Sequence, residues 1–492
     1  MKLTKSLVLA TALALIAGAA EAARTDLVVG MVLEPPHLDP TAGAAAAIDE
    51  VTYANIFEGL TRIGRAGEVL PALAESWTIS EDGKTYTFKL HTGVKFHDGT
   101  DLTSEDVKFS LDRARAEGST NAQKPLFAQI ADVAATDPAT VTITLKQPQG
   151  AFLYNMGWGD AVIVAPESAE GNKEKPIGTG PFKFDNWAKG SSITIVKNPD
   201  YWGKAVALDK AEFRIIPDAA AAIPALLSGD VQAFANAPVG DALPQIEGDS
   251  RFKVVIGATE GETILSMNNG KAPLNDLKVR QAVNYALNRQ EIIDGASNGL
   301  GVPIGSHFSP ANEAYVDLTG MYPYDPAKAK ALLAEAGYPN GFDAKIKLPP
   351  PPYARQGGEI IASELRQVGI NLEIIPVEWA DWLQQVFKDK DYDFTIISHV
   401  EPNDIEIYSR PTYYFDYHND AFNKVIAELD VTADPAKRNQ LYKQAQEILA
   451  KDAVVGFLFQ LPKVGVWDAK LEGMWENTPT PSIDLTEVHW AE

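Results

Sequence analysis

The chain has 492 residues, no cysteine, 45% hydrophobic residues and a formal net charge of -23. The lack of cysteine excludes disulfides, thiolate metal sites and a lipid-modified cysteine. The acidity disfavours nucleic acid and anionic lipid surfaces as partners. Single hydrophobic cores stop growing near roughly 250 to 300 residues, so this length predicts two or three domains.

The N-terminus has the pattern of an export signal. Lys2 and Lys5 precede the apolar run 7–16, and Ala20 and Ala22 are small residues suited to cleavage. The run is too short to span a bilayer, and no later apolar stretch reaches about 18 residues. We therefore expect residues 1–22 to be a cleavable signal peptide, no direct membrane insertion, and a location in the periplasm.

Strand patterns recur along the chain. Short apolar runs, several of them alternating with polar residues, predict strands at 26–33, 84–90, 140–145, 192–198, 212–217 and 392–398. Asp82 and Gly83 form a hairpin turn signal between a tryptophan-led segment and the strand that follows it.

Residues typical of helix starts and ends lie between these predicted strands. Asp325 and Pro326 open one helix that Gly337 ends, and Asp434 opens another with the proline that follows it. A third helix is predicted within 275–289, capped by Asn275 or Asp276. The proline run 349–352 is expected to be an extended loop. The mixture of strands and helices predicts an α/β architecture.

Residues 56–113 read IFEGLTRIGRAGEVLPALAESWTISEDGKTYTFKLHTGVKFHDGTDLTSEDVKFSLDR. This segment resembles the signature region of the extracellular solute-binding proteins of family 5, the peptide, dipeptide and nickel binding group. The resemblance continues through residues 32–41, 177–187, 197–202, 279–289 and 325–341. It covers nearly all of the chain after the export signal.

The resemblance implies a fold like that of the type II periplasmic binding proteins, with two hinged lobes and an extra inserted domain of the cluster C kind. It also implies lobe I at 24–60, 180–270 and 480–492, the inserted domain at 61–179, and lobe II at 271–479. A small organic ligand, a peptide or an amino-acid-like solute, would bind between the lobes of a monomer. The protein would then deliver this ligand to an inner-membrane ABC permease without a cofactor.

Arg355 is the first candidate ligand contact. A guanidinium pairs with a carboxylate through two charge-assisted hydrogen bonds. Arg355 stands just before or within the first turn of a predicted helix, where the resemblance implies an arginine facing the ligand carboxylate. The alternative is a solvated arginine at a helix start.

The loop after the strand at 392–398 supplies the second group of candidates. Its side chains combine aromatic rings with charges of both signs: His399, Glu401, Asp404, Tyr408, Arg410 and Tyr413. The resemblance implies that this strand edge and loop contact the ligand backbone and hold its ammonium, with Glu401 or Asp404 as the acid. His399 stands where relatives have a tryptophan, which leaves an opine or a modified amino acid open as the ligand.

Candidates also come from the other side of the expected cleft. Asn155 and Trp158 lie near the end of the expected inserted domain, and Glu34 follows the first strand. Trp158 is either an aromatic that stacks on the ligand or a core residue.

Other functions remain as alternatives. Residues 295–299 match the G-x-S-x-G pattern of serine hydrolases, but a helix precedes them where that motif needs a strand. The seven histidines are scattered singly, so no metal site is expected, although a nickel chelate or a sugar could bind to the same fold. A second role as a chaperone or chemosensory receptor also stays open.

Overall fold

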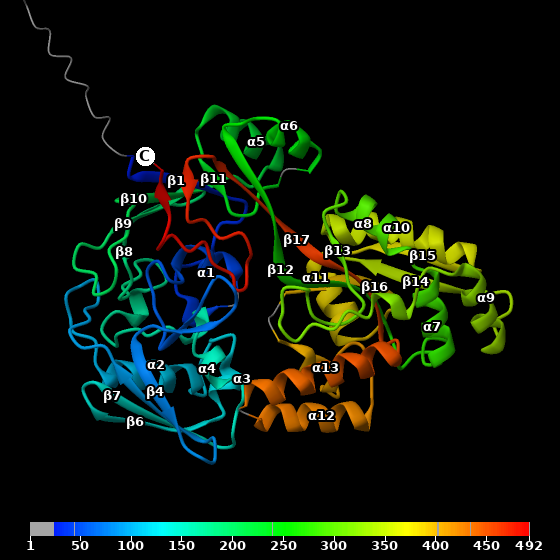
Figure 1. Cartoon of the computed structure of the whole chain (residues 1–492), viewed down its shortest axis with the longest axis horizontal. Helices are drawn as coiled ribbons and strands as arrows, with labels where there is room; N and C mark the ends of the chain where they lie inside the picture. The colour runs from blue at the N-terminus through cyan, green and yellow to red at the C-terminus, as the bar shows by residue number, and fades with distance from the viewer. Residues whose placement is uncertain (1–23, 44, 239, 401–402, 433, 492) are drawn as a thin grey trace, which may run out of the picture.

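The computed structural model describes residues 24–43, 45–238, 240–400, 403–432 and 434–491. The expected signal peptide and Glu401 lie outside the described residues. Two α/β lobes are joined by the long strands β12 (Phe252–Met267) and β17 (Val455–Asp468), and a third body, rich in strands, lies below the first lobe (Figure 1). This architecture confirms the predicted mixed α/β fold.

The first lobe is built on one end of the 11-stranded sheet. Its strands follow β17 in the order β11 (Ala233–Phe234), β1 (Asp26–Met31), β10 (Lys210–Ile215), β9 (Ser192–Lys197) and β8 (Phe182–Ala188). The side chains of Leu27 and Val29 on β1 are buried in the core. Helices of this lobe are α1 (Ala46–Thr52), α5 (Ala219–Ser228) and α6 (Leu243–Glu247).

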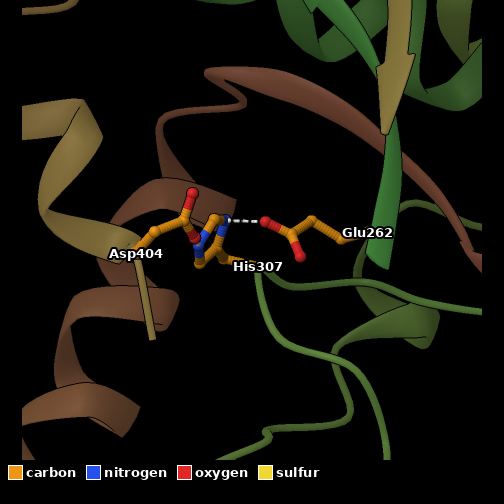
Figure 2. A group of neighbouring side chains, drawn as sticks. All are labelled: Glu262, His307 and Asp404. Carbon is orange, nitrogen blue, oxygen red and sulfur yellow. Dashed lines mark hydrogen bonds and ion pairs between the residues drawn. The ribbon is translucent and has the colours of Figure 1, made fainter. Parts of the chain in front are cut away.

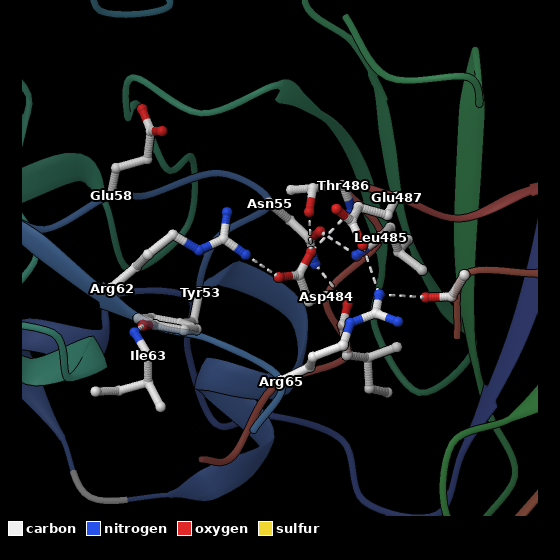
Figure 3. Close-up of polar contacts among 12 residues, drawn as sticks. Tyr53, Asn55, Glu58, Arg62, Ile63, Arg65, Asp484, Leu485, Thr486 and Glu487 are labelled. Carbon is white, nitrogen blue, oxygen red and sulfur yellow. Dashed lines mark hydrogen bonds and ion pairs between the residues drawn. The ribbon is translucent and has the colours of Figure 1, made fainter. Parts of the chain in front are cut away.

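The C-terminal segment makes polar contacts with Asn55 and Arg62 (Figure 3). Asn55 binds the backbone of this segment twice, by donating to the carbonyl of Ile483 at 2.9 Å and accepting from the N–H of Leu485 at 3.0 Å. The guanidinium of Arg62 lies 2.5 Å from the buried carboxylate of Asp484. The segment after β17, with its short strands β18 (Leu471–Glu472) and β19 (His489–Trp490), thus lies beside the start of the chain.

The third body has its own sheet and core. Its strands run in the order β4 (Ala74–Ile79), β5 (Thr85–Leu90), β7 (Thr140–Leu145) and β6 (Ile130–Asp137). Thr103 caps helix α2 (Ser104–Arg115), which packs on this sheet through Val107 and Leu111. A small hairpin, β2 (Thr61–Ile63) with β3 (Val69–Pro71), and the short helices α3 (Lys124–Phe127) and α4 (Phe152–Asn155) complete it.

The second lobe continues the same sheet. Beyond β17 and β12 the strands are β16 (Phe394–His399), β14 (Phe342–Leu348) and β15 (Ile370–Pro376), and β13 (Val302–Pro303) pairs with β17. The helices are α7 (Leu277–Ala286), α8 (Arg289–Ala296), α9 (Pro326–Glu335), α10 (Pro352–Gln367), α11 (Trp379–Asp381), α12 (Asp420–Val431) and α13 (Pro435–Lys451).

The helix caps are those predicted from the sequence. Asp325 caps α9 and Asp434 caps α13, while Asp276 rather than Asn275 caps α7. The proline run was expected to be a loop throughout, but Pro352 is the first residue of α10. A proline is tolerated there because the first helical N–H has no partner within the helix.

The crossing between the lobes contains an irregularity in the sheet. Pairing of β12 with β17 shifts register between Ala258 and Glu262. The hydroxyl of Thr259 bridges this break by donating to the carbonyl of Leu461 at 2.7 Å and accepting from the N–H of Gly261 at 2.9 Å. The two strands are therefore tied together where they pass from one lobe to the other.

The division of the chain into lobes stays a prediction. Trp467, Leu471 and Met474 pack in the same core as Leu27 and Leu485. These contacts favour a return to the first lobe within β17, earlier than the expected boundary at residue 479.

Candidate functional site

A cavity of about 640 Å³ lies between the third body and the second lobe. The third body contributes residues from the segments 123–129 and 147–158, and the second lobe contributes residues from 382–413 and from α12 and α13. Six residues predicted from the sequence line this cavity together: Asn155, Trp158, His399, Asp404, Arg410 and Tyr413.

Aromatic rings form much of the apolar wall. Trp158 makes an edge-on contact with Tyr154, with ring centroids 6.1 Å apart. On the facing lobe, Phe387 makes a similar contact with Tyr413 at 5.3 Å. Phe387 and Trp382 belong to a π-helical segment, Trp382–Lys388, a rare conformation that occurs often at functional sites.

The cations in the lining are already paired. The guanidinium of Arg410 lies 2.7 Å from the carboxylate of Glu406 and stacks over the ring of Tyr413. Arg438 donates to the carbonyls of Leu429 and Thr432, and to the hydroxyl of Tyr442. An anionic ligand group would therefore have to share these guanidinium groups with their present acceptors.

Glu406 gives the cavity acidic character. Removal of this carboxyl from water raises its pKa, the neighbouring Asp404 adds to the increase, and Arg410 opposes it. Glu260 also has a raised pKa, first because of burial and then because of Asp404. A positive charge placed among these carboxyl groups would relieve their mutual repulsion.

The buried imidazole of His307 contacts the carboxylate of Asp404 (Figure 2). His307 Nε2 lies 2.9 Å from Asp404 Oδ1, and His307 Nδ1 lies 3.1 Å from Glu262 Oε1. His307 and Glu262 are buried, at 0% and 1% exposure, and Asp404 is nearly so. The Nε2 contact has hydrogen-bond geometry, whereas the Nδ1 contact is an ion-pair distance without it. Either an imidazolium between two carboxylates or a neutral ring with one protonated carboxyl is compatible with these contacts. Each arrangement leaves one net negative charge.

The same three residues could offer three ligands to a cation. Each nitrogen of His307 already faces its own carboxylate, however, and a single ion can bind only one of these nitrogens. Burial lowers the pKa of His307, while the negative charge of Glu406 opposes this effect. The arrangement is that of an imidazole held between two carboxylates rather than that of a metal centre.

His399 and Tyr408 support the loop in different ways. His399 Nε2 lies 2.9 Å from the hydroxyl of Tyr414, and its Nδ1 lies 4.0 Å from Asp404. Tyr408 stacks on Phe415 at 4.6 Å and is buried in the core of the second lobe. Tyr408 therefore lies behind the cavity rather than on its surface.

Two predicted contacts lie away from the cavity. Arg355 is on α10, where its guanidinium lies 3.1 Å from the exposed carboxylate of Glu378. Glu34 accepts hydrogen bonds from the indole N–H of Trp187 at 2.9 Å and from the N–H of Gly190 at 2.8 Å. Glu34 thus fastens the β8–β9 turn in the first lobe. Neither residue lines the cavity, and Glu401 lies outside the described residues.

Several lining residues could not be predicted from the sequence. The segments that carry them are the π-helical turn and the facing ends of α12 and α13, and the side chains include Trp382, Leu383, Phe387, Asp430, Arg438 and Tyr442. None of these residues stands in a recognisable motif. Their approach to the third body depends on how the two bodies pack.

Ser297, the serine of the G-x-S-x-G pattern, ends a helix. It lies just after α8, where its hydroxyl donates to the carbonyl of Ile293 at 3.1 Å and accepts from the N–H of Gly301 at 3.2 Å. Both contacts are with the backbone. This geometry is that of a helix C-terminus and not of a serine placed on a turn after a strand.

Comparison with known proteins gives concordant results. A family model described as bacterial extracellular solute-binding proteins, family 5 middle, matches residues 68–424. The dipeptide-binding protein of Escherichia coli (strain K12) is 33% identical over 433 residues, which is 78% of this chain and 80% of that protein. The glutathione-binding protein GsiB of the same strain is 29% identical over 504 residues, 95% of each chain.

A solved structure has the same fold. The periplasmic binding protein DppA from Helicobacter pylori, in complex with the peptide STSA, superposes with a TM-score of 0.81 and 28% identity. The match covers 96% of this chain and 99% of that one. Among the described residues, no helix combines the length and the apolar character needed to cross a membrane. The chain belongs to the bacterial extracellular solute-binding proteins of family 5, a family of binding proteins.

Proposed function

We propose that this protein is the periplasmic substrate-binding component of an ABC importer, and that it captures a peptide or an amino-acid-like solute in the cavity between the third body and the second lobe. The observation that carries the proposal is the cavity itself, whose volume of about 640 Å³ is lined by aromatic rings and by charged groups of both signs. Binding sites for small molecules commonly have this size and this mixture of apolar walls with few polar groups.

The end of β16 supports a peptide-like ligand. Ile397, Ser398 and His399 are the last three residues of β16, and all three line the cavity. A strand end can offer backbone donors and acceptors to an extended peptide, while pockets between aromatic rings accept its side chains. The relatives named as dipeptide-binding and glutathione-binding proteins support the same class of ligand.

An opine or another amino-acid-like solute is the second candidate. Arg355, the expected partner of a ligand carboxylate, does not line the cavity, and the lining arginines Arg410 and Arg438 are paired within the protein. This arrangement departs from the carboxylate contact that the family resemblance implies for a free dipeptide, which keeps an amino-acid-like solute of another shape as a candidate. Nickel chelates and sugars are further ligands that the same fold could accept.

Periplasmic location and delivery to an inner-membrane permease are part of the proposal. Mass spectrometry of the protein recovered from the periplasm should show that the first 22 residues have been removed. The purified protein should elute as a monomer. Cells that lack its permease should lose uptake of the ligand, while the binding protein itself still binds the ligand.

Native mass spectrometry of protein purified without denaturation tests the ligand class, because a co-purified solute adds its own mass. Calorimetry then compares dipeptides, glutathione, a nonapeptide, an opine, nickel with histidine, and glucose. Binding with a Kd of about 1 μM or tighter, near -8 kcal/mol, supports the proposal. Ligand at 100 times its Kd should stabilise the fold by about 2.7 kcal/mol and raise its melting temperature. A protein that carries no solute and binds no member of the panel would contradict the proposal.

A further inference from the structure

His307 lies between the carboxylates of Asp404 and Glu262 (Figure 2). On one side it contacts Asp404, which lines the cavity. On the other side it contacts Glu262, the first residue of β12 that pairs again with β17 after the register shift. Glu262 also pairs through its backbone with His399 on β16, another lining residue. The imidazole therefore joins the cavity wall to the crossing strand.

The burial of His307 with two carboxyl groups is unfavourable for the stability of the fold. Two carboxyl groups and an imidazole are removed from water within the second lobe, next to the ring of Tyr408 and the charge of Glu406. Burying such charges is unfavourable before their mutual attraction is counted, and apolar residues of similar volume often replace them without loss of stability. A role in stabilising the core is therefore a weak explanation for this triad.

We propose that His307 is a positioning residue for ligand binding, which holds the Asp404 carboxylate at the cavity wall and ties it through Glu262 to the strand that crosses between the lobes. The inference rests on the proposed function, because it assigns His307 to the same cavity. A carboxylate fixed in this way meets the ligand without first losing conformational freedom. Asp404 and Glu262 contact the same imidazole. A movement of Glu262 on β12 would therefore also move Asp404 at the cavity wall.

Two substitutions test the contacts of His307 with Asp404 and with Glu262 separately. In His307→Gln, the amide reaches the position of Nε2 and can still donate to Asp404. In His307→Asn, the shorter amide reaches the position of Nδ1 and can donate only to Glu262. Both changes disturb the core, so a purely structural role predicts parallel losses of stability and affinity.

The experiment measures the Kd of alanylphenylalanine and of glutathione by calorimetry, and the melting temperature without ligand, for the full-length protein and both variants. We expect His307→Gln to keep the Kd within about threefold of wild type and His307→Asn to weaken it about tenfold or more, a loss of about 1.4 kcal/mol. The two variants should melt at similar temperatures. If only His307→Gln keeps the wild-type Kd, then the contact of His307 with Asp404 is the one that supports ligand binding.

His97 supplies a matched control. Its ring bonds the carbonyl of Gly180 at 3.0 Å and the N–H of Gly178, at the join of the first lobe and the third body, and it does not line the cavity. His97→Gln and His97→Asn should lower the melting temperature without changing either Kd. Equal affinities in both His307 variants would overturn the inference while leaving the proposed function intact. Failure of the wild-type protein to bind either probe would count against peptide capture itself, and with it against this role of His307.

Discussion

The backbone N–H of Gly150 donates to the carbonyl of Asp430 at 3.2 Å. Gly150 belongs to the third body and Asp430 to α12 of the second lobe, and both residues line the cavity. A Cβ atom on Gly150 would collide with the guanidinium of Arg438 and the carbonyl of Thr432. Two bodies far apart along the chain thus meet at the cavity through a contact that only glycine permits.

Gly150→Val should weaken ligand binding. The added side chain keeps the third body away from Arg438 and Thr432, so the cavity cannot reach the observed arrangement without displacing them. Because overpacking costs typically 1 to 3 kcal/mol, we expect a loss of about fivefold or more in affinity, measured by calorimetry. Thermal unfolding without ligand should change little, since the substitution acts between bodies and not within a core.

Gly118→Val is the matched control for this experiment. Gly118 belongs to the third body as well, and a Cβ there would meet no atom within 4 Å. This variant should bind ligand as the wild-type protein does. If Gly150→Val binds equally well, the contact with Asp430 is not needed in the ligand-bound form.

Asp404→Asn should reduce affinity for any ligand that presents an ammonium group. Asparagine keeps the shape of the side chain and can accept a hydrogen bond from His307, but it removes the negative charge at the cavity wall. A hydrogen bond to a charged group contributes about 1.5 to 3 kcal/mol, so we expect a loss of roughly tenfold to a hundredfold in Kd. The exposed Asp389→Asn, beside the π-helical turn, is the control. Equal affinity in Asp404→Asn would place the ligand ammonium elsewhere.

The two candidate arginines should behave differently from one another. Arg410 lines the cavity, whereas Arg355 pairs with Glu378 outside it. For a ligand with a carboxylate, Arg410→Ala should raise the Kd severalfold and Arg355→Ala should leave it unchanged, as measured by calorimetry. The opposite result would mean that Arg355 reaches the ligand in a state more closed than the present one. In that case the expectation from the sequence would stand.

Much of the fold could be predicted because local signals and long-range packing agree. Asp325 and Asp434 cap helices as expected, and the strand at 140–145 is paired on both sides in the third body's sheet. Each of these features depends on a few neighbouring residues. The proline run shows the limit of such reasoning, because the first helical position accepted Pro352.

The candidate site was harder to predict because its walls come from separate bodies. His399 and Asp404 stand out as polar residues just after a strand, and Trp158 as an aromatic in a loop. Trp382 and Phe387 face the cavity only because the chain forms a π-helical turn there. Arg355 had a plausible position in the sequence, but Glu378, just before α11, provides an acceptor for it outside the cavity. Such a choice of partner depends on tertiary packing.

The stability of the second lobe should fall as pH rises, because of Glu364. Burial raises the pKa of this carboxyl from 4.5 to about 8, and Oε2 accepts from the N–H of Asn288 while Oε1 has no hydrogen-bond partner among the described residues. Between these two pH values the folded state holds a proton that the unfolded state has released. The free energy of unfolding therefore decreases with pH across this window, and the contribution is complete only below about pH 4.5.

Glu364→Gln removes this titration but keeps an acceptor for Asn288. The variant should unfold at higher urea concentration than wild type at pH 8, by a difference of about 1 kcal/mol or more, and at nearly the same concentration at pH 4.5. Glu359→Gln, an exposed position on the same helix, should follow the wild-type protein at both values. If the two glutamine variants respond alike to pH, then the Glu364 carboxyl must be reached by water or by a cation in solution, and the burial of α10 against α8 must be looser than the packing shown here.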